Sequence, residues 1–171
     1  MILDFSIAQL LGFVSYFIGV SMFFQKDDRK LKILMLIFNT NHMVHFYLLG
    51  SMVSAATALL GVFRSGAAIY TSSRYVTAFF VALVLATGAV MVTDIWSVLP
   101  LAGMLIGTCS MFLLKGISLR LGFMCASAFW LANNVHVGSI GGTLLEITLM
   151  MVNSTTIYRL YKQDVRALAN C

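Results

Sequence analysis

The sequence predicts an all-α integral membrane protein whose seven transmembrane helices form two parallel three-helix bundles joined by a linker helix. The first observation is composition: of 171 residues, 60% are hydrophobic and only 10% are charged, whereas ordinary soluble domains carry about 25% charged residues. The second is that apolar runs divide the whole chain into seven segments, and the third is a partial internal repeat. A soluble fold of this composition would expose large apolar areas to water, so we expect the chain to lie in lipid.

The first four segments are each apolar over roughly the 20 residues that a helix needs to cross a bilayer. The first has Asp4 and no Lys or Arg before its apolar run, so it lacks the basic start of a cleaved signal peptide and is interpreted as a span. The second ends at the Gly50-Ser51 turn, the third contains Arg64, and the fourth carries no charge. In order, these segments are Ile2–Phe24, Ile33–Leu49, Met52–Tyr70 and Tyr75–Val92.

The last three segments follow the same pattern. The fifth contains Pro100, the only proline of the chain, near its start, and a glycine-rich turn beginning at Gly138 separates the sixth from the seventh. They are Val98–Leu114, Leu119–Val137 and Gly141–Tyr161. No connection is long enough to be a soluble domain, so residues 1–171 are expected to form a single transmembrane domain. Its parts are a first three-helix bundle at 2–70, a linker helix at 75–92, a second bundle at 98–161 and a cytoplasmic tail at 162–171.

The basic residues predict the orientation in the membrane. Ten of the 11 Lys and Arg residues lie on one side of the predicted spans, whereas the amino terminus and the turns at Gly50, Thr93 and Gly138 have none. The positive-inside rule makes the basic side cytoplasmic, which puts the amino terminus outside and the carboxyl terminus in the cytoplasm. The ten are Lys26, Arg29, Lys30, Lys32, Arg74, Lys115, Arg120, Arg159, Lys162 and Arg166.

Short identities in the two halves indicate an internal repeat. Ser21-Met22-Phe23, followed by Lys26, recurs 89 residues later as Ser110-Met111-Phe112, followed by Lys115. Two further pairs recur at an offset of 88 residues: Gly50-Ser51 as Gly138-Ser139, and Ile69-Tyr70 as Ile157-Tyr158. The first three helices would then correspond to the last three. A single linker helix between them lets the second bundle run in the same direction as the first.

Polar residues inside the segments suggest a site near the bilayer midplane. A charge at the centre of a span costs about 2.5–3.5 kcal/mol on insertion scales, so Arg64 and Glu146 are expected to face inward. Counting about 1.5 Å per residue from the Gly50 and Gly138 turns puts His42, Trp130 and Glu146 in one layer about 12 Å deep. The candidate substrate-binding residues are Asn39, His42, Arg64, Trp130, Glu146 and Asn153.

The same residues also have purely structural interpretations. Trp130 could serve packing alone, and membrane-embedded Asn side chains often only hydrogen-bond one helix to another. Arg64 is the natural cation for Glu146. The two backbones are separated by about six residues, or roughly 9 Å, along the membrane normal. We therefore expect an indirect link between them, through water or a neighbour such as Asn153.

Several function classes lack support in the sequence. It contains no nucleophile motif, phosphate-binding glycine loop or pair of carboxylates, so we expect no enzymatic activity. His42 and His45 could offer a metal two nitrogens, but no third ligand is suitably placed, and we expect neither a metal nor a cofactor. The net charge of +5 comes from residues beside the spans, which argues against nucleic acid. The expected partners are the lipid bilayer and a small solute, with a homo-oligomer left open.

Two stretches carry a resemblance to a known family. They are Phe23-Phe24-Gln25-Lys26-Asp27-Asp28-Arg29 and Gly138-Ser139-Ile140-Gly141-Gly142-Thr143, the latter leading to Glu146 and Asn153. With them the chain resembles the Imp-YgjV family of bacterial inner-membrane proteins over nearly its whole length. The resemblance implies an inner-membrane location and a multi-pass fold, and it supplies no established binding or catalytic residue.

The three-one-three layout is also similar to that of sugar facilitators of the SWEET type and vitamin-precursor carriers of the PnuC type, which is an analogy of fold. The chain lacks the Pro-Gln pair expected in the first helix of each sugar-facilitator bundle, because Leu101 follows Pro100. A small-solute transporter or facilitator is the leading hypothesis. The alternative is a non-transporting partner or assembly factor whose buried charges only hold helices together. A water-accessible cavity reaching His42, Trp130 or Glu146 would favour transport.

Overall fold

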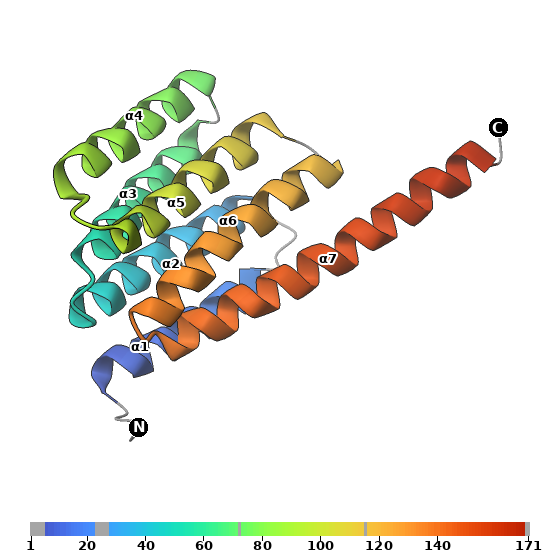
Figure 1. Cartoon of the computed structure of the whole chain (residues 1–171). Helices are drawn as coiled ribbons and strands as arrows, with labels where there is room; N and C mark the ends of the chain where they lie inside the picture. Colours follow the sequence, from blue (N-terminus) through green and yellow to red (C-terminus); the bar gives the residue numbers. More distant parts are fainter. Residues whose placement is uncertain (1–5, 23–27, 72, 115, 170–171) are drawn as a thin grey trace.

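The computed structural model describes residues 6–22, 28–71, 73–114 and 116–169, and these residues form seven α-helices. Successive helices run in opposite directions, so that α1, α3, α5 and α7 all run the same way (Figure 1). The all-helical architecture and the number of helices agree with the sequence prediction. The helices are α1 (Ile7–Met22), α2 (Asp28–Leu48), α3 (Met52–Tyr70), α4 (Arg74–Met91), α5 (Ile95–Leu113), α6 (Gly116–His136) and α7 (Ile140–Ala169).

Four helices, α2, α5, α6 and α7, differ from the predicted segments by three or more residues at one end. α6 begins at Gly116, three residues before the predicted start. α2 begins at Asp28, so Arg29 and Lys30 belong to its first turn and not to a loop. α5 begins at Ile95, because Asp94 and Ser97 form a capping box there. α7 continues to Ala169, so the backbone of the expected tail is helical over 162–169. Residues 1–5 and 23–27, which include both ends of the first predicted segment and the beginning of the first motif, lie outside the described residues.

Six of the helices close into a ring. α1 packs against α2, α2 against α3, α3 against α5, α5 against α6, α6 against α7, and α7 back against α1. α4 lies outside this ring, against α3 and α5 (Figure 1). The groups α1–α3 and α5–α7 thus follow the same order around the ring. They meet at two seams, which we call the α3–α5 seam and the α1–α7 seam.

The turns after α2 and α6 have the same geometry. After α2, the Ser51 N–H donates to the Phe46 carbonyl and the Gly50 N–H to the Tyr47 carbonyl, both at 3.0 Å. This pair of bonds is a Schellman motif, which requires a residue in the left-handed region. Both bonds recur 88 residues later, at 2.8 and 3.3 Å, and Gly50 and Gly138 have φ angles of 77° and 75°. The matching turns support the internal repeat.

Side chains are sorted in the opposite way to a soluble protein. Polar side chains lie in the interior: His45, Asn133 and Asn134 are among the largest fully buried side chains of the described residues. Apolar side chains cover the outside, where Phe17 is 68% and Val90 85% exposed. An exterior of this kind is stable only against an apolar solvent, because exposing such large apolar patches to water is unfavourable in free energy.

Of the described helices, α3, α4 and α5 are long and apolar enough, by length and composition, to cross a membrane. α1 is apolar but shorter, with 16 residues. α2, α6 and α7 are less apolar on average because they carry many polar residues, of which His42, Asn133 and Asn153 are buried in the bundle. Their lower apolar content therefore includes polar groups that would not face lipid.

Glycines bring α1 and α7 into close contact. A Cβ atom at Gly141 would overlap the backbone of Gly12, and a Cβ atom at Gly12 would lie 2.8 Å from Cε1 of His45. Small residues allow such backbone contact between membrane helices. The α1–α7 seam is therefore closed by backbone, whereas the long side chain of Arg64 crosses the α3–α5 seam to Thr108.

Candidate functional site

Two of the six candidate residues, His42 and Trp130, lie on either side of Phe46. The His42 ring is perpendicular to the Phe46 ring, with centroids 4.5 Å apart, and Phe46 stacks on Trp130 at 5.9 Å. We call His42, Phe46 and Trp130 the aromatic layer. α2 and α6 are not neighbours in the ring, so this layer crosses its interior. Gly103 of α5 makes room for the indole, since a Cβ atom there would lie 2.7 Å from Trp130 Cδ1.

His42 is held on its other side by α1. Its Nδ1 lies 2.8 Å from the Ser15 hydroxyl oxygen, which also accepts a hydrogen bond from the side-chain amide of Asn41 at 2.8 Å. Because Asn41 donates to this hydroxyl, Ser15 can donate its own hydrogen to Nδ1 of His42. Neutral His42 then carries its proton on Nε2. The imidazole is thereby oriented by a two-bond chain within the α1–α2 interface.

Asn39 and Arg64 both serve helix contacts around α3. The Asn39 amide donates to the Met35 carbonyl at 2.7 Å and to the Ser65 hydroxyl at 3.1 Å, which ties α2 to α3. Arg64 Nη1 donates to the Thr108 hydroxyl at 2.6 Å, and its Nε is buried without a hydrogen-bond partner among the described residues. Arg64 therefore bridges the α3–α5 seam through a hydroxyl and keeps an unused donor.

Glu146 is buried, at 7% exposure, and faces the bundle interior as predicted. The Ser127 hydroxyl of α6, one helical turn from Trp130, lies near the Glu146 carboxyl group. The carboxyl oxygen Oε2 has no partner among the described residues. Glu146 thus lies buried beside α6 and keeps an oxygen without a hydrogen-bond partner among the described residues.

Asn153 does not make the bridge that the sequence suggested. Its Oδ1 accepts from Arg120 Nη1 at 3.3 Å, and its Nδ2 donates to the Leu149 carbonyl of its own helix at 3.0 Å. Arg64 uses Thr108 instead, so no direct hydrogen bond of the described residues joins Asn153 to Arg64. Arg120, interpreted from sequence only as a topology residue, is half-buried and ties α6 to α7.

Two further bonds connect the three-helix groups. His45 Nδ1 donates to the Ala8 carbonyl at 2.6 Å, so its Nε2 accepts from the Ser139 hydroxyl at 2.7 Å, immediately before α7. At the equivalent position 88 residues later, Asn133 Oδ1 accepts from the Ser54 hydroxyl of α3 at 3.0 Å. Each middle helix is thus bonded to the start of the third helix in the other group. Both His45 nitrogens are occupied, so it does not offer a metal a free nitrogen beside His42.

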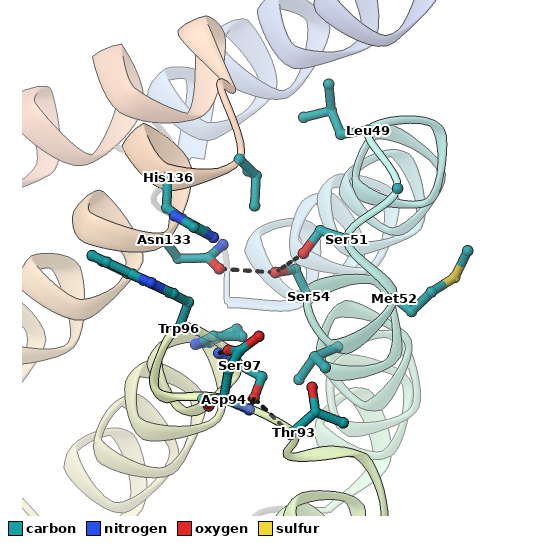
Figure 2. A pocket seen from close by; sticks show the side chains of 14 residues that line it. Leu49, Ser51, Met52, Ser54, Thr93, Asp94, Trp96, Ser97, Asn133 and His136 are labelled. Carbon is teal, nitrogen blue, oxygen red and sulfur yellow. Dashed lines mark hydrogen bonds between the residues drawn. The ribbon is translucent and has the colours of Figure 1, made fainter.

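A polar pocket of about 430 Å³ lies where the turn after α2, the loop before α5 and the end of α6 meet. We call it the turn-end pocket. Figure 2 shows Asp94, Trp96 and His136 around it, with Ser54 bonded to Asn133 across it. The Trp96 and His136 rings stack at 4.4 Å with an angle of 5° between their planes. These two residues and Asp94 are exposed, so the pocket opens at this end of the bundle.

The turn-end pocket stops above the aromatic layer. Asn133 lines it, and Trp130 lies three residues, or about 4.5 Å, further along α6. The residues lining the pocket do not include His42, Trp130 or Glu146. The pocket therefore does not reach the residues that the sequence placed in one midplane layer.

Sequence reasoning missed Asp94, Trp96 and His136. An Asp-x-x-Ser pattern at positions 94–97 does signal a helix start, and Asp94 Oδ1 accepts from the Ser97 N–H at 2.8 Å. The pattern does not reveal that α6 ends opposite this loop. From sequence, Asn133 was interpreted only as one of the Asn side chains that hydrogen-bond one helix to another, yet its Nδ2 is buried without a partner among the described residues.

Over the described residues, the interior offers isolated hydrogen-bonding groups. The part of the chain that the structure describes has no cluster of three His, Cys, Asp or Glu side chains that could hold a metal. Among the described residues, Arg64 Nε, Glu146 Oε2 and both amide atoms of Asn134 have no hydrogen-bond partner. Such an arrangement is suited to binding a polar solute by hydrogen bonds.

Comparison with known proteins identifies the family. The family model Imp-YgjV, described as a bacterial inner membrane protein, matches residues 6–164. The inner membrane protein YgjV of Escherichia coli (strain K12) is 30% identical over 162 residues, which cover 95% of this chain and 88% of that protein. No solved structure matches the chain significantly. The chain therefore belongs to the Imp-YgjV family of bacterial inner membrane proteins.

Proposed function

We propose that this inner-membrane protein is a transporter or facilitator for a small solute, with a binding site inside the helix ring. The observation that carries the proposal is the set of unpartnered polar atoms buried there: Arg64 Nε, Glu146 Oε2 and the Asn134 amide. A buried polar group without a partner costs about 1–3 kcal/mol. A stable chain can keep such groups where a bound solute or water completes their hydrogen bonds.

The proposal includes seven membrane crossings. α3, α4 and α5 are apolar enough on composition alone. The outward faces of α2, α6 and α7 are apolar too, with Ile37, Leu121 and Met151 at 48%, 54% and 64% exposure. Lipid contacts only those outward faces, so the polar residues inside the ring do not prevent these helices from crossing.

The proposed orientation puts the Gly50, Thr93 and Gly138 turns outside the cell and the carboxyl terminus in the cytoplasm. Arg29, Arg74, Arg159 and Lys162 lie at the helix ends opposite these turns. Basic residues near helix ends are retained on the cytoplasmic side of a bacterial inner membrane. In this orientation the turn-end pocket opens outward.

A parallel duplication would provide a mechanism for alternating access. The two groups of three helices follow the same order around the ring, and their Schellman turns match at an offset of 88 residues. Rocking of one such group against the other about a fixed midplane site is how many transporters operate. The two seams and the aromatic layer would be the surfaces that move. No catalytic step is part of this proposal.

One observation favours a second candidate, a non-transporting partner or assembly factor. The aromatic layer fills the ring between α2 and α6, and the pocket above it does not reach His42, Trp130 or Glu146. In that case Arg64 and Glu146 would only fasten α3 to α5 and α6 to α7.

Reconstitution separates the two functions. Proteoliposomes containing the purified protein and protein-free liposomes are incubated with the small-molecule fraction of a bacterial extract, and the solutes retained inside are compared without preselection. Transport predicts at least one solute that accumulates reproducibly only with the protein. Identical solute profiles over several imposed ion gradients would reject transport. Co-purification with a defined inner-membrane protein from mild detergent would then support the second candidate.

A further inference from the structure

The turn-end pocket has the properties of a ligand site in its own right. Its volume of about 430 Å³ lies within the range of roughly 300–1,000 Å³ typical of small-molecule sites. We propose that it binds a small organic cation that also carries a hydrogen-bond acceptor, such as a primary amine next to a carbonyl group. Three features of the pocket select this chemistry: one carboxylate, one orphaned amide donor and one half-exposed indole.

The carboxylate belongs to Asp94. Its Oδ1 accepts from the Ser97 N–H at 2.8 Å as the cap of α5, and a carboxylate has further lone pairs for a ligand. The described residues that line the pocket include no Lys or Arg, and the only other titratable side chain among them is that of His136, on α6. The pocket thus has one fixed negative charge and no fixed positive charge, which favours a cation over an anion.

The amide belongs to Asn133, which is 2% exposed. Figure 2 shows its side chain directed from α6 across the pocket toward Ser54, whose hydroxyl donates to Oδ1 at 3.0 Å. Nδ2 has no partner among the described residues. Because the Ser54 hydroxyl donates to Oδ1, the amide nitrogen Nδ2 is the atom left without a partner. If the amide were turned over, Oδ1 would be the unpartnered atom instead. A hydrogen-bond acceptor on a ligand at the floor of the pocket would give Asn133 Nδ2 the partner that it lacks.

The indole belongs to Trp96, which is 49% exposed. His136 covers one face of the ring, with centroids 4.4 Å apart and the planes 5° from parallel. Nearly half of the Trp96 surface is exposed, and an indole attracts a cation more strongly than any other side-chain ring. Asp94, at the cap of α5, and Trp96, in its first turn, both line the pocket.

This binding site does not depend on transport. If the proposed function is correct, the pocket is the external recognition site and the inference names the class of its substrate. If the protein does not transport, the pocket remains a receptor site for the same class. Binding is therefore measured on non-transporting material, the purified protein in nanodiscs, and flux is measured separately in proteoliposomes.

The test uses Trp96 as its own reporter. The chain has two tryptophans, so the Trp130→Phe variant leaves Trp96 as the single tryptophan, excited at a wavelength that tyrosine does not absorb. The probes are leucinamide, N-acetylleucinamide and N-acetylleucine, which share a side chain and carry a positive, zero and negative charge. Calorimetric titration of the unmodified protein repeats the measurement without the substitution. We expect saturable binding of leucinamide, at least about fivefold tighter than the neutral probe, and none of the anion.

Two substitutions separate charge from structure. Asp94→Asn keeps a good helix cap and removes the charge, whereas Asp94→Glu keeps the charge on a side chain that caps less well. We expect Asp94→Asn to weaken leucinamide binding about five- to tenfold and Asp94→Glu to change it by less than about twofold. Asn133→Ala should weaken leucinamide and N-acetylleucinamide alike, because both carry the acceptor.

Three results would overturn the inference: equal affinity for the charged and neutral probes, unchanged binding in Asp94→Asn, or no saturable signal by either fluorescence or calorimetry. Solute flux that persists without leucinamide binding would reject the pocket inference and leave the proposed function standing. Leucinamide binding without flux of any solute would reject the proposed function and leave the pocket inference standing.

Discussion

The two charged residues inside the ring are each stabilised by a hydroxyl group on a neighbouring helix. Arg64 donates to Thr108 across the α3–α5 seam, and Glu146 lies against Ser127 between α6 and α7. A hydroxyl can both donate and accept, so it can pair with either sign of charge. Each charge thus fastens two helices and still keeps an unpartnered atom, Nε or Oε2, for another ligand.

Removing the hydroxyl partner of Arg64 should destabilise the protein. Thr108→Val keeps the side-chain shape but leaves a buried guanidinium donor unpaired, which costs about 1–3 kcal/mol. We expect the melting temperature in detergent to fall by several degrees. Thr87→Val is the matched control, because Thr87 bonds only to the Leu83 carbonyl of its own helix, and it should be nearly neutral.

A double-mutant cycle checks the cause of that loss. In an Arg64→Met background no guanidinium remains to be satisfied, so Thr108→Val should cost much less than it does in the original chain. An equal loss in both backgrounds would contradict the role given to the Arg64–Thr108 bond.

Glu146→Gln distinguishes a binding role from a structural one. Glutamine retains the shape and an oxygen for Ser127, so the melting temperature should change little. If Glu146 contacts solute, flux in proteoliposomes should fall about tenfold, which corresponds to about 1.4 kcal/mol. The measurement pairs flux with thermal melting on the same preparation. A lower melting temperature together with unaltered flux would assign Glu146 to structure alone.

Sequence reasoning could predict which residues are inward but not which of them meet. A charge within an apolar segment is nearly always turned away from lipid, and Glu146 is. Which side chains meet depends on how each helix is rotated about its own axis. A count of residues from the turns gives depth only and contains no information on this rotation. Asn153 was therefore matched with Arg64, whereas its partner is Arg120. Whether the six candidates bind a solute stays a prediction.

At the scale of helices, the two seams are closed by different means. Gly12 and Gly141 bring the backbones of α1 and α7 together, and Gln9 reinforces the contact by donating to the Gly138 carbonyl at 2.6 Å. The α3–α5 seam has the Arg64–Thr108 bond inside and the turn-end pocket at one end. The α1–α7 seam is therefore expected to be the more rigid of the two.

Adding a methyl group at the rigid seam should separate its helices. A Cβ atom at Gly141 would overlap backbone atoms of Gly12, which cannot move aside as a side chain could. We expect Gly141→Ala to destabilise the protein by about 1–3 kcal/mol, although alanine is otherwise the better helix former.

Gly107→Ala is the control for that substitution, because its Cβ atom would lie an ordinary 3.7 Å from the Ala126 Cβ. This variant should be neutral or slightly more stable. Thermal melting of both variants in the same detergent makes the comparison. Equal effects would show that the α1–α7 contact is looser than described.

Helix ends were predictable where glycine or small polar residues follow the apolar run, and not where charged residues flank it. α2, α3 and α6 end within one residue of the predicted positions, at Leu48, Tyr70 and His136. The run of charges before Ile33 suggested a loop, but charged side chains at a membrane surface can continue a helix into water. α2 accordingly starts at Asp28, and α7 extends to Ala169.

At the scale of the whole molecule, the ring sorts polar groups inward and apolar groups outward. Hydropathy averaged along a helix cannot detect this sorting, which is why α2, α6 and α7 look less like spans than α3, α4 and α5 do. The sequence predicted seven helices and their alternating direction from segment lengths and turns. It could not predict that α7 would return to α1, because that contact depends on the angle at which each pair of helices crosses.

The proposed orientation makes a prediction about both faces of the membrane. A reporter fused after Arg166 should be active only if it is one that works in the cytoplasm, because Arg159 and Lys162 retain that end inside. A cysteine introduced at Ser51 should react with a membrane-impermeant thiol reagent added to intact cells. If the reagent instead labelled a cysteine introduced in the tail and did not label the one at position 51, the protein would have the opposite orientation.

The outside position of α4 bears on how such a chain could arise. α4 touches only α3 and α5, so its removal would leave every contact within the ring in place. Two separate copies of a three-helix chain, inserted the same way round, would then close an equivalent ring about a two-fold axis. A gene of half this length, whose product pairs with itself, is thus a sufficient ancestor. Fusing two such genes end to end requires one extra helix, because the first copy ends on the opposite side of the membrane from where the second must begin.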